Sequence, residues 1–307
     1  MNLKDIAKKG DRVSSGHRLC AGCGAGTVAR AVLNSSENPA VVGCATGCLE
    51  VSTTIYPYTA WEDSFIHNAF ENVAATISGV EAAYRTFKRK GKIDEDYDFI
   101  AFGGDGGTYD IGLQSLSGAM ERGHDMLYVC YDNGAYMNTG IQRSSATPKG
   151  ANTTTSPSGT KIPGKQQNRK ELTDIIAAHG VPYVAQAAPW RPMDLIRKVK
   201  KALKVKGPTF LNVLAPCPRG WRTNPEASME ISKIASNTCF WPLFEVENGE
   251  WKLNYIPSEK EPIENWLKPQ GRFSHLFNEK NKALIEEIQE YVDNRWDKIK
   301  ELAGETE

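Results

Sequence analysis

Short apolar runs alternate with amphipathic segments along the first two thirds of this chain. Residues 41–44 (VVGC), 98–103 (DFIAFG) and 126–131 (MLYVCY) are the apolar runs, and each is typical of a buried strand in a parallel sheet. Between them, residues 68–88 and 109–122 have the apolar spacing of helices. Strand, helix and strand in this order make a βαβ unit. The pattern predicts an α/β fold with a mostly parallel sheet flanked by helices.

The alternation is interrupted once and then resumes. Residues 137–170 contain almost no large apolar side chain and many Thr, Ser, Gly and Pro residues. We expect this stretch to supply no core and to act as a lid or a subunit contact, with a mobile surface loop as the alternative. From residue 171 the sequence predicts in turn a helix (ELTDIIAAHG), a strand (YVAQA), a helix (RPMDLIRKVKKAL) and a strand (PTFLNVLA).

The C-terminal part has a different pattern. Two aromatic runs flank Asn248–Gly249, which is a strong hairpin signal, and an amphipathic helix is expected near residues 279–303. We expect an α/β domain over residues 1–225 and a hairpin and helical extension over residues 226–307.

Charge and hydropathy limit the class of protein. The 37 Lys and Arg residues balance the 37 Asp and Glu residues, which removes the general electrostatic argument for binding nucleic acid or an anionic membrane. The sequence has no apolar run of about 18 residues, and its first residues are too polar for a secretory signal. We therefore expect a cytoplasmic protein that binds neither nucleic acid nor a membrane.

Four of the seven cysteines form a candidate metal-binding set. Cys20 and Cys23 make a C-x-x-C pair, Cys48 follows a predicted strand end, and Cys217 follows the strand PTFLNVLA. The pair by itself is compatible with zinc, an iron–sulfur cluster or a redox dithiol. Four thiolates from loops at one sheet edge would suit a buried [4Fe-4S] cluster. Zinc would accept the same four ligands.

A second candidate site surrounds Gly104–Asp105–Gly106. This triplet lies where a predicted strand ends, at the sheet edge where open α/β folds bind ligands. Asp105 offers a carboxylate oxygen, and Asn133 offers an amide oxygen at the end of the next strand. Together with diphosphate oxygens and a backbone carbonyl they could complete the octahedron of Mg²⁺. The alternative is a structural turn with a capping aspartate.

These motifs together resemble those of the β subunit of pyruvate:ferredoxin oxidoreductase (pyruvate synthase), within the 2-oxoacid:ferredoxin oxidoreductase superfamily. The matching stretches, in order, are residues 20–24 (CAGCG), 45–48 (ATGC), 104–106 (GDG) with 109–112 (YDIG), 132–140 (DNGAYMNTG) and 215–221 (APCPRGW). The resemblance implies a thiamine diphosphate-binding fold. It also implies oxidative, reversible decarboxylation of pyruvate with coenzyme A to acetyl-CoA, CO₂ and reduced ferredoxin.

The resemblance further implies the role of each site residue. Cys20, Cys23, Cys48 and Cys217 would bind one [4Fe-4S] cluster, while Asp105, Asn133 and the backbone carbonyl of Ala135 would bind Mg²⁺. Gly104, Gly106, Gly107 and Tyr136 would contact thiamine diphosphate, and Asn138 would lie beside the reacting carbon of the cofactor as the catalytic residue.

Partners follow from the same resemblance. The carboxylate that activates thiamine would come from another subunit, so this chain would be active only with the α, γ and δ subunits or their fused equivalents. Ferredoxin, a 2-oxoacid and coenzyme A would be the other partners. Two alternatives remain at this point: the same chemistry on oxalate, a branched-chain 2-oxoacid, 2-oxoglutarate or an aryl pyruvate, and a non-catalytic zinc-stabilised binding module.

Overall fold

The sheet that organises the molecule has eight strands in the order β2-β1-β3-β4-β6-β5-β7-β8. We describe a computed structural model, in which residues 10–305 are described. The first six strands of this order run parallel, and β7 and β8 are antiparallel to their neighbours. The strands are β1 (Ala40–Ala45), β2 (Ser64–Asn68), β3 (Asp98–Gly104), β4 (Leu127–Asp132), β5 (Tyr183–Ala187), β6 (Thr209–Leu214), β7 (Phe244–Glu247) and β8 (Glu250–Leu253). The predicted α/β fold class is confirmed.

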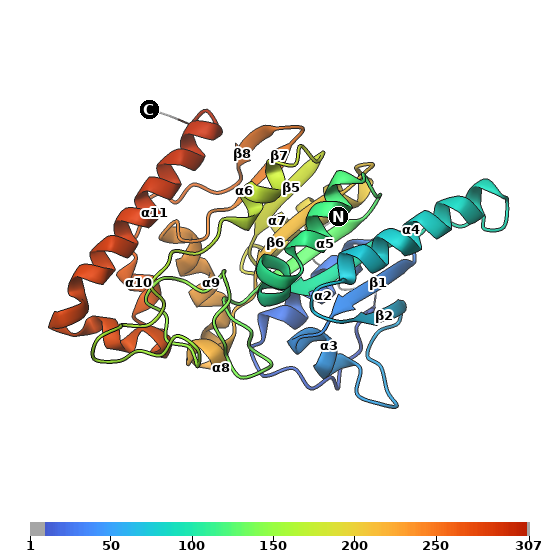
Figure 1. The fold of residues 1–307 in the computed structure, drawn as a ribbon. Coiled ribbons are helices and arrows are strands. Elements are labelled where there is room, and N and C mark those ends of the chain that lie inside the picture. The colour runs from blue at the N-terminus through green and yellow to red at the C-terminus, as the bar shows by residue number, and fades with distance from the viewer. Residues whose placement is uncertain (1–9, 306–307) are drawn as a thin grey trace.

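Helices cover both faces of this sheet (Figure 1). One face is covered by α2 (Gly24–Ser35), α3 (Cys48–Thr53) and α7 (Pro192–Lys204). The other face carries α4 (Val73–Arg89), α5 (Leu113–Glu121), α6 (Leu172–Ala177), α9 (Ser228–Asn237), α10 (Glu264–Leu267) and α11 (Lys282–Leu302). Short turns complete the order: the π-helical η1 (Gly107–Ile111), α8 (Pro218–Trp221), and the 3-10 turns η2 (Pro225–Ala227), η3 (Gly271–Phe277) and η4 (Glu279–Asn281).

The central strands are buried on both faces, which explains their continuous apolar character. Along β3, Phe99 and Ala101 pack into the core on one side, whereas Ile100 and Phe102 pack into the core on the other. Successive side chains of a strand point to opposite faces, so a strand between two helical layers needs apolar residues at every position. Cys130 in β4 is fully buried in the same way.

Two helix boundaries differ from the expectation. Residue 68 ends strand β2, and helix α4 begins only at Val73 after the N-cap Asn72. Likewise, the helix expected over 109–122 is a π-helical turn from Gly107 followed by α5 from Leu113. In both places the chain uses extra residues between strand and helix, and these residues lie at the carboxyl edge of the sheet.

Segment 137–170 is irregular, and it packs against its own chain. Ala146 and Ala151 are fully buried in the main core, so the expectation that this segment supplies no core was wrong. The buried hydroxyls find internal acceptors: Ser144 donates to Asp105 at 2.5 Å, and Thr147 donates to the carbonyl of Gly134 at 2.7 Å. Small side chains whose hydroxyl groups are hydrogen-bonded within the chain can therefore fill a core, as apolar side chains do.

The predicted C-terminal hairpin is present and continues the main sheet. Asn248 and Gly249 connect β7 to β8 with φ values of 50° and 86°, as a tight hairpin turn requires. Strand β7 pairs with β5, and α11 packs on the outside of this region (Figure 1). The division of the chain near residue 225 stays a prediction.

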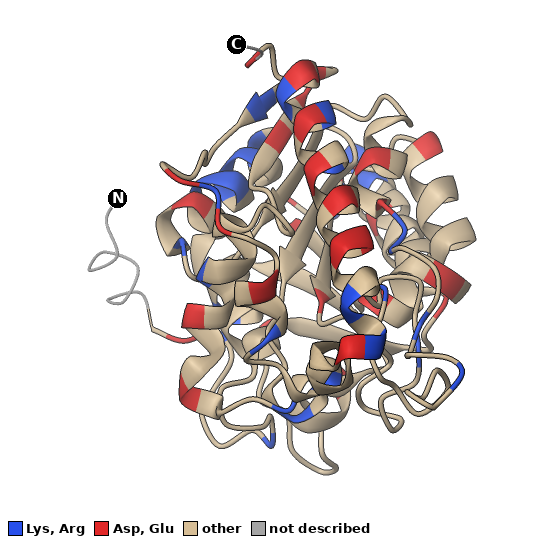
Figure 2. Cartoon of the chain, turned by 90° about the vertical axis from the view of Figure 1, so that its left-hand side faces the viewer, with Lys and Arg blue, Asp and Glu red and all other residues tan. Residues whose placement is uncertain are grey.

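Charged residues of both signs occur across the side of the molecule seen in Figure 2. Among the helices of residues 10–305, none combines the length and the apolar character that a membrane span requires.

Candidate functional site

Four neighbouring strands bring the predicted site residues to one edge of the sheet. Strands β1, β3, β4 and β6 are adjacent and parallel. The residues directly after their carboxyl ends include Cys48, Asp105, Asn133 and Cys217. Because carboxyl ends of parallel strands meet at the same edge, the two motifs predicted separately become neighbours.

All four candidate cysteines line one cavity of about 340 Å³. Cys20 and Cys23 reach the cavity from the loop before α2. A 2.9 Å hydrogen bond from Gly24 N–H to the carbonyl of Pro216 joins the end of this loop to the loop of Cys217. Gly22 makes a close backbone approach: a Cβ there would lie 2.3 Å from the carbonyl oxygen of Pro225. Two segments far apart in sequence, the loop of Cys20 and Cys23 and the stretch after Cys217, are thus fixed against each other.

Burial in the cavity disfavours the thiolate form of Cys48 and Cys217. Burial, together with the neighbouring thiols, raises the pKa of Cys48 to about 12 and that of Cys217 to about 11. A nearby positive centre is needed to make several such thiols ionise at neutral pH, which is what metal binding provides. Within residues 10–305, no three His, Cys, Asp or Glu side chains are gathered closely enough to form a ready metal site.

Backbone N–H groups point at two of the sulfur atoms. The N–H of Gly220 donates to Cys217 Sγ at 3.4 Å, and backbone hydrogen bonds from Ala25 and Gly26 oppose the rise in the pKa of Cys23. Such hydrogen bonds stabilise thiolate charge and tune the potential of a bound cluster.

Asp105 is fully buried at the neighbouring strand end. Its Oδ2 accepts from Ser144 Oγ at 2.5 Å, and its Oδ1 accepts from the backbone N–H of Asn133 at 3.2 Å. Burial, with the nearby charge of Asp132 as second cause, raises the pKa of Asp105 well above its usual range. A cation at Oδ1 would restore the carboxylate, which fits a metal ligand.

Three oxygen acceptors converge beside Asp105. The side-chain amide oxygen of Asn133 lies 2.9 Å from Asp105 Oδ1 and 2.9 Å from the backbone carbonyl oxygen of Ala135. Oxygen acceptors this close to each other need either a donor or a cation between them. If the amide of Asn133 were rotated by 180°, its nitrogen would donate to Asp105 Oδ1 and to the carbonyl of Ala135. The spacing also suits Mg²⁺, because two ligands about 2.1 Å from the ion at right angles lie about 3 Å apart. The residues present therefore fit magnesium.

At two glycines the backbone after β3 packs so closely against its own chain that a side chain would not fit. A Cβ at Gly106 would lie 2.4 Å from the Tyr136 ring, whose hydroxyl donates to the Gly106 carbonyl at 2.7 Å. A Cβ at Gly107 would lie 2.7 Å from the carbonyl oxygen of Phe70. Together with Gly104 and Asn138 these residues line a narrow cleft at the sheet edge. Open α/β sheets bind phosphate groups at such a glycine-rich turn after a strand.

The cavity lined by the four cysteines (the cysteine cavity) and the cleft beside Asp105 (the Asp105 cleft) have lining residues in common. Cys48, Asn133, Met137 and Asn138 line both. The structure thus brings together all of the predicted site residues around two adjoining spaces.

Sequence reasoning missed several residues that shape the site. Ser144 supports Asp105 from the irregular segment, and no spacing signal points to it. Arg169, from the end of that segment, lies 2.7 Å from Asp132 Oδ2, which also accepts from Tyr109 at 2.6 Å. Asp132 Oδ1 accepts from Gly134 N–H at 3.0 Å, so this buried ion pair fixes the turn that carries Asn133.

The other cysteines lie outside the cavity. Cys44, Cys130 and Cys239 are buried in the core, and none of them is among the residues around the four thiols.

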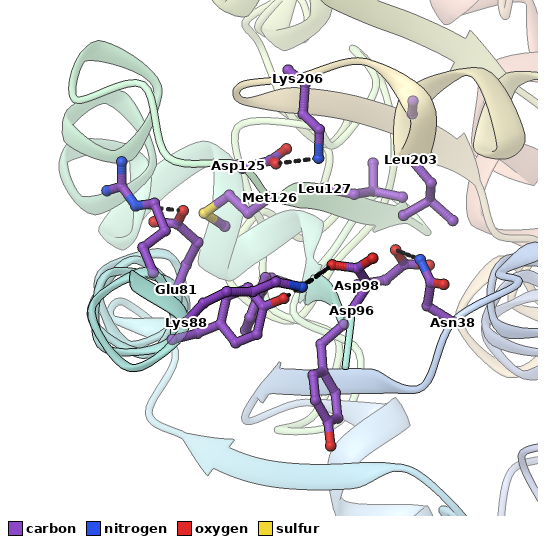
Figure 3. Close-up of a pocket in the computed structure, with 15 residues that line it drawn as sticks. Asn38, Glu81, Lys88, Asp96, Asp98, Asp125, Met126, Leu127, Leu203 and Lys206 are labelled. Carbon is purple, nitrogen blue, oxygen red and sulfur yellow. Dashed lines mark hydrogen bonds and ion pairs between the residues drawn. The ribbon is translucent and has the colours of Figure 1, made fainter. Parts of the chain in front are cut away.

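A separate cavity of about 370 Å³ opens at the amino ends of β3 and β4 (Figure 3). Its charged side chains are engaged with one another: Arg85 with Glu81 at 2.8 Å, Lys206 with Asp125 at 3.1 Å, and Lys88 with Asp96. These pairs leave the cavity without the convergent free groups of a catalytic site.

Comparison with known proteins identifies the family. Residues 42–213, more than half of the chain, match the model of the thiamine pyrophosphate enzyme, C-terminal TPP binding domain. Pyruvate synthase subunit PorB of Thermotoga maritima is 54% identical over 97% of this chain and 95% of its own length, and that of Methanocaldococcus jannaschii is 55% identical over 91% and 93%. This chain belongs to the pyruvate synthase PorB family.

Membership of the PorB family confirms the predicted resemblance. Ketoisovalerate oxidoreductase subunit VorB of Pyrococcus furiosus is also similar, at 45% identity over 94% of this chain and 92% of that protein. A solved 2-oxoglutarate:ferredoxin oxidoreductase from Magnetococcus marinus matches with a TM-score of 0.56 and 20% identity over 76% of this chain and 80% of its own. At that identity the match supports the fold alone.

Proposed function

We propose that this chain is the thiamine diphosphate- and [4Fe-4S]-binding β subunit of a pyruvate:ferredoxin oxidoreductase. In this proposal pyruvate and coenzyme A react with oxidised ferredoxin to give acetyl-CoA, CO₂ and reduced ferredoxin, reversibly. The observation that carries the proposal is the shared wall, since Cys48, Asn133, Met137 and Asn138 line both the cysteine cavity and the Asp105 cleft. Thiamine diphosphate would break the carbon–carbon bond and the cluster would remove the electrons, so the proposal needs the two cofactors to be neighbours.

Each cofactor has its own residues in this proposal. Asp105, Asn133 and the carbonyl of Ala135 hold Mg²⁺, and the backbone of Gly104, Gly106 and Gly107, with Tyr136, receives the diphosphate. When bound, thiamine diphosphate supplies the electron sink for decarboxylation of a 2-oxoacid, and an iron–sulfur cluster accepts electrons singly. Asn138, at the wall between the two spaces, would orient the substrate by hydrogen bonding.

The shape of the cysteine cavity favours a cluster over zinc. One zinc ion with bonds of about 2.3 Å would draw four sulfur atoms into contact with each other. A cluster of four irons and four sulfides keeps its cysteine ligands apart, and the four thiols here surround a cavity of about 340 Å³. Polar N–H groups aimed at Cys217 and Cys23 support the same assignment.

Pyruvate is the proposed substrate because relatives named pyruvate synthase reach 54% and 55% identity. A branched-chain 2-oxoacid is the second candidate, favoured by the 45% identity to a ketoisovalerate oxidoreductase subunit. The partners in either case are the other subunits of the oxidoreductase, ferredoxin and coenzyme A, and the proposed location is the cytoplasm.

Composition analysis of anaerobically purified protein tests the cofactors. We expect brown protein with about four irons and four sulfides per chain, together with bound thiamine after addition of Mg²⁺. Asp105→Ala should lose thiamine and keep iron, whereas Cys217→Ser should lose iron and keep thiamine. Colourless protein with one zinc per chain would overturn the proposal. Ferredoxin reduction by the assembled complex with pyruvate and with 2-oxoisovalerate then assigns the substrate.

A further inference from the structure

Arg272 is a buried cation beside Trp221 and the turn that carries Asn133. Its side chain is in η3 and only 2% exposed. The guanidinium stacks on Trp221 with a distance of 4.5 Å to the ring centroid and lies 5.0 Å from the centroid of Phe273. It also reaches the Asn133–Gly134–Ala135 turn, because a Cβ at Gly134 would lie 3.1 Å from its Nη1.

The surroundings of Arg272 differ from those of the other buried arginines. Arg169 lies 2.7 Å from Asp132, and Arg295 donates to Asp174 at 2.6 Å. For Arg272 no carboxylate of residues 10–305 lies within ion-pair distance, and its Nε donates to the neutral amide oxygen of Gln270 at 3.0 Å. A buried guanidinium without a counter-charge is costly, so its position implies an anion nearby.

The ionisable groups that interact electrostatically with Arg272 include residues of both candidate sites, Cys217 and Asp105. Burial lowers its pKa to about 9, and the groups that oppose this fall are Cys217 first, then Asp132 and Asp105. Asp132 is already paired with Arg169. Geometry connects Arg272 to the cysteine cavity as well: Trp221, on which it stacks, ends α8 directly after Cys217, and the turn that it reaches carries Asn133, which lines the cavity.

We propose that Arg272 is the internal counter-cation of the iron–sulfur cluster held by Cys20, Cys23, Cys48 and Cys217, and that its charge raises the reduction potential of that cluster. The inference rests on the proposed function. Reduction adds one negative charge to a cluster that four thiolates already make anionic, and a fixed cation in a dry site stabilises the reduced form. Stacking on Trp221 fixes the cation while it leaves the guanidinium edges free of carboxylate partners.

The test is a potentiometric titration of the isolated full chain, followed by electron paramagnetic resonance under anaerobic conditions. Without partner subunits the sample contains this cluster alone. Arg272→Met should shift the equilibrium toward the oxidised cluster at least tenfold, which is about 59 mV more negative for a one-electron couple. Arg272→Lys, which keeps the charge, should shift it by much less.

The controls separate charge from packing. Arg295→Met removes another buried arginine, which lies on α11 and is paired with Asp174 of α6, and should leave the potential unchanged. An unchanged potential in Arg272→Met, or an equal shift in Arg272→Met and Arg272→Lys, would overturn the inference. If Arg272→Met failed to hold iron while Arg272→Lys kept both iron and potential, charge compensation would be supported; loss of iron in both would count against it. A wild-type chain without iron would instead refute the proposed function itself.

Discussion

Asn133, one of the four residues that line both spaces, connects the two sites by hydrogen bonds. Its backbone N–H donates to Asp105 Oδ1 at 3.2 Å, and its backbone carbonyl accepts from the indole Nε1 of Trp221 at 2.7 Å. Trp221 belongs to α8, the turn that begins directly after Cys217. One hydrogen bond therefore joins the helix after Cys217 to a proposed magnesium ligand.

Trp221→Phe should weaken binding of thiamine diphosphate with Mg²⁺. The change removes the indole N–H and leaves the buried carbonyl of Asn133 without its donor, which typically costs about 1–3 kcal/mol. We expect roughly a tenfold higher dissociation constant, measured by isothermal titration calorimetry at fixed Mg²⁺. Trp241→Phe is the matched control, since Trp241 donates to the carbonyl of Ala187 at 2.8 Å and is not among the residues that line either space. Equal affinities in wild type and Trp221→Phe would contradict this coupling.

Gly22→Ala should abolish iron binding while it preserves thiamine binding. The new Cβ would lie 2.3 Å from the carbonyl oxygen of Pro225, so the loop of Cys20 and Cys23 must leave its place. Iron and thiamine content of the purified variants is the measurement. Gly16→Ala controls for backbone strain, because Gly16 has φ of 92° with nothing within 4 Å of a Cβ, against φ of 71° at Gly22. Iron retained in Gly22→Ala would mean that this loop position does not matter.

At the scale of elements, the sequence predicts best what is buried on both faces. Strands β3, β4 and β6 are continuous apolar runs because helices cover both sides, and each was found at its predicted place. Strand β2 was not predicted. It is an edge strand of the sheet, three of the five residues in its sequence SFIHN are polar, and only Asn68 in it is buried. No periodic signal therefore distinguishes it from a loop.

The site was predictable where its residues have a fixed spacing to strand ends, and unpredictable elsewhere. Asp105 and Asn133 follow adjacent strands, and topology alone makes them neighbours. Ser144 and Arg272 reach the same region from irregular stretches. Their positions depend on tertiary packing of the 137–170 segment and of η3, which no local pattern encodes.

Lys165 makes the stability of the 137–170 segment depend on pH. Its buried ammonium donates to the carbonyls of Thr147, Ser145 and Asn168, and burial lowers its pKa to about 7. Above pH 7 the folded chain loses this proton, whereas the unfolded chain keeps it to about pH 10. The free energy of unfolding should therefore rise with pH from about 7 upward, by at most about 1.4 kcal/mol per pH unit.

Lys165→Met should remove this part of the pH dependence. Urea denaturation at pH 6, 7, 8 and 9 gives the difference in unfolding free energy between wild type and variant, and this difference should favour wild type increasingly above pH 7. Lys161→Met, at an exposed position of the same segment, should retain the wild-type dependence. A constant difference between wild type and Lys165→Met from pH 6 to pH 9 would refute the role of Lys165.

At the scale of the whole molecule, large exposed apolar side chains lie around the carboxyl edge of the sheet. Tyr56 and Tyr58 are 93% and 78% exposed, in the loop between α3 and β2 that projects from the body (Figure 1). Ile111, 60% exposed, ends η1 just after the Asp105 cleft, and Ile162, 55% exposed, lies in the 137–170 segment. Exposed apolar residues around a cofactor site are typical of a surface that a partner chain covers.

The double substitution of Tyr56 and Tyr58 by Ser should weaken assembly with the other oxidoreductase subunits without loss of the cofactors in this chain. Exposed tyrosines contribute strongly to interfaces once they are buried, so we expect at least a tenfold lower affinity for the partner subunits. Co-expressed complexes, separated by size-exclusion chromatography and analysed for iron and thiamine, provide the measurement. Phe87→Ser with Ile256→Ser is the control, since these side chains are 44% and 51% exposed and line neither the cysteine cavity nor the Asp105 cleft. If the tyrosine variant assembled as well as wild type while the control did not, the partner surface would lie elsewhere. Because the carboxylate that activates thiamine is expected from a partner, loss of assembly should also abolish pyruvate-dependent ferredoxin reduction, and excess partner subunits should restore it.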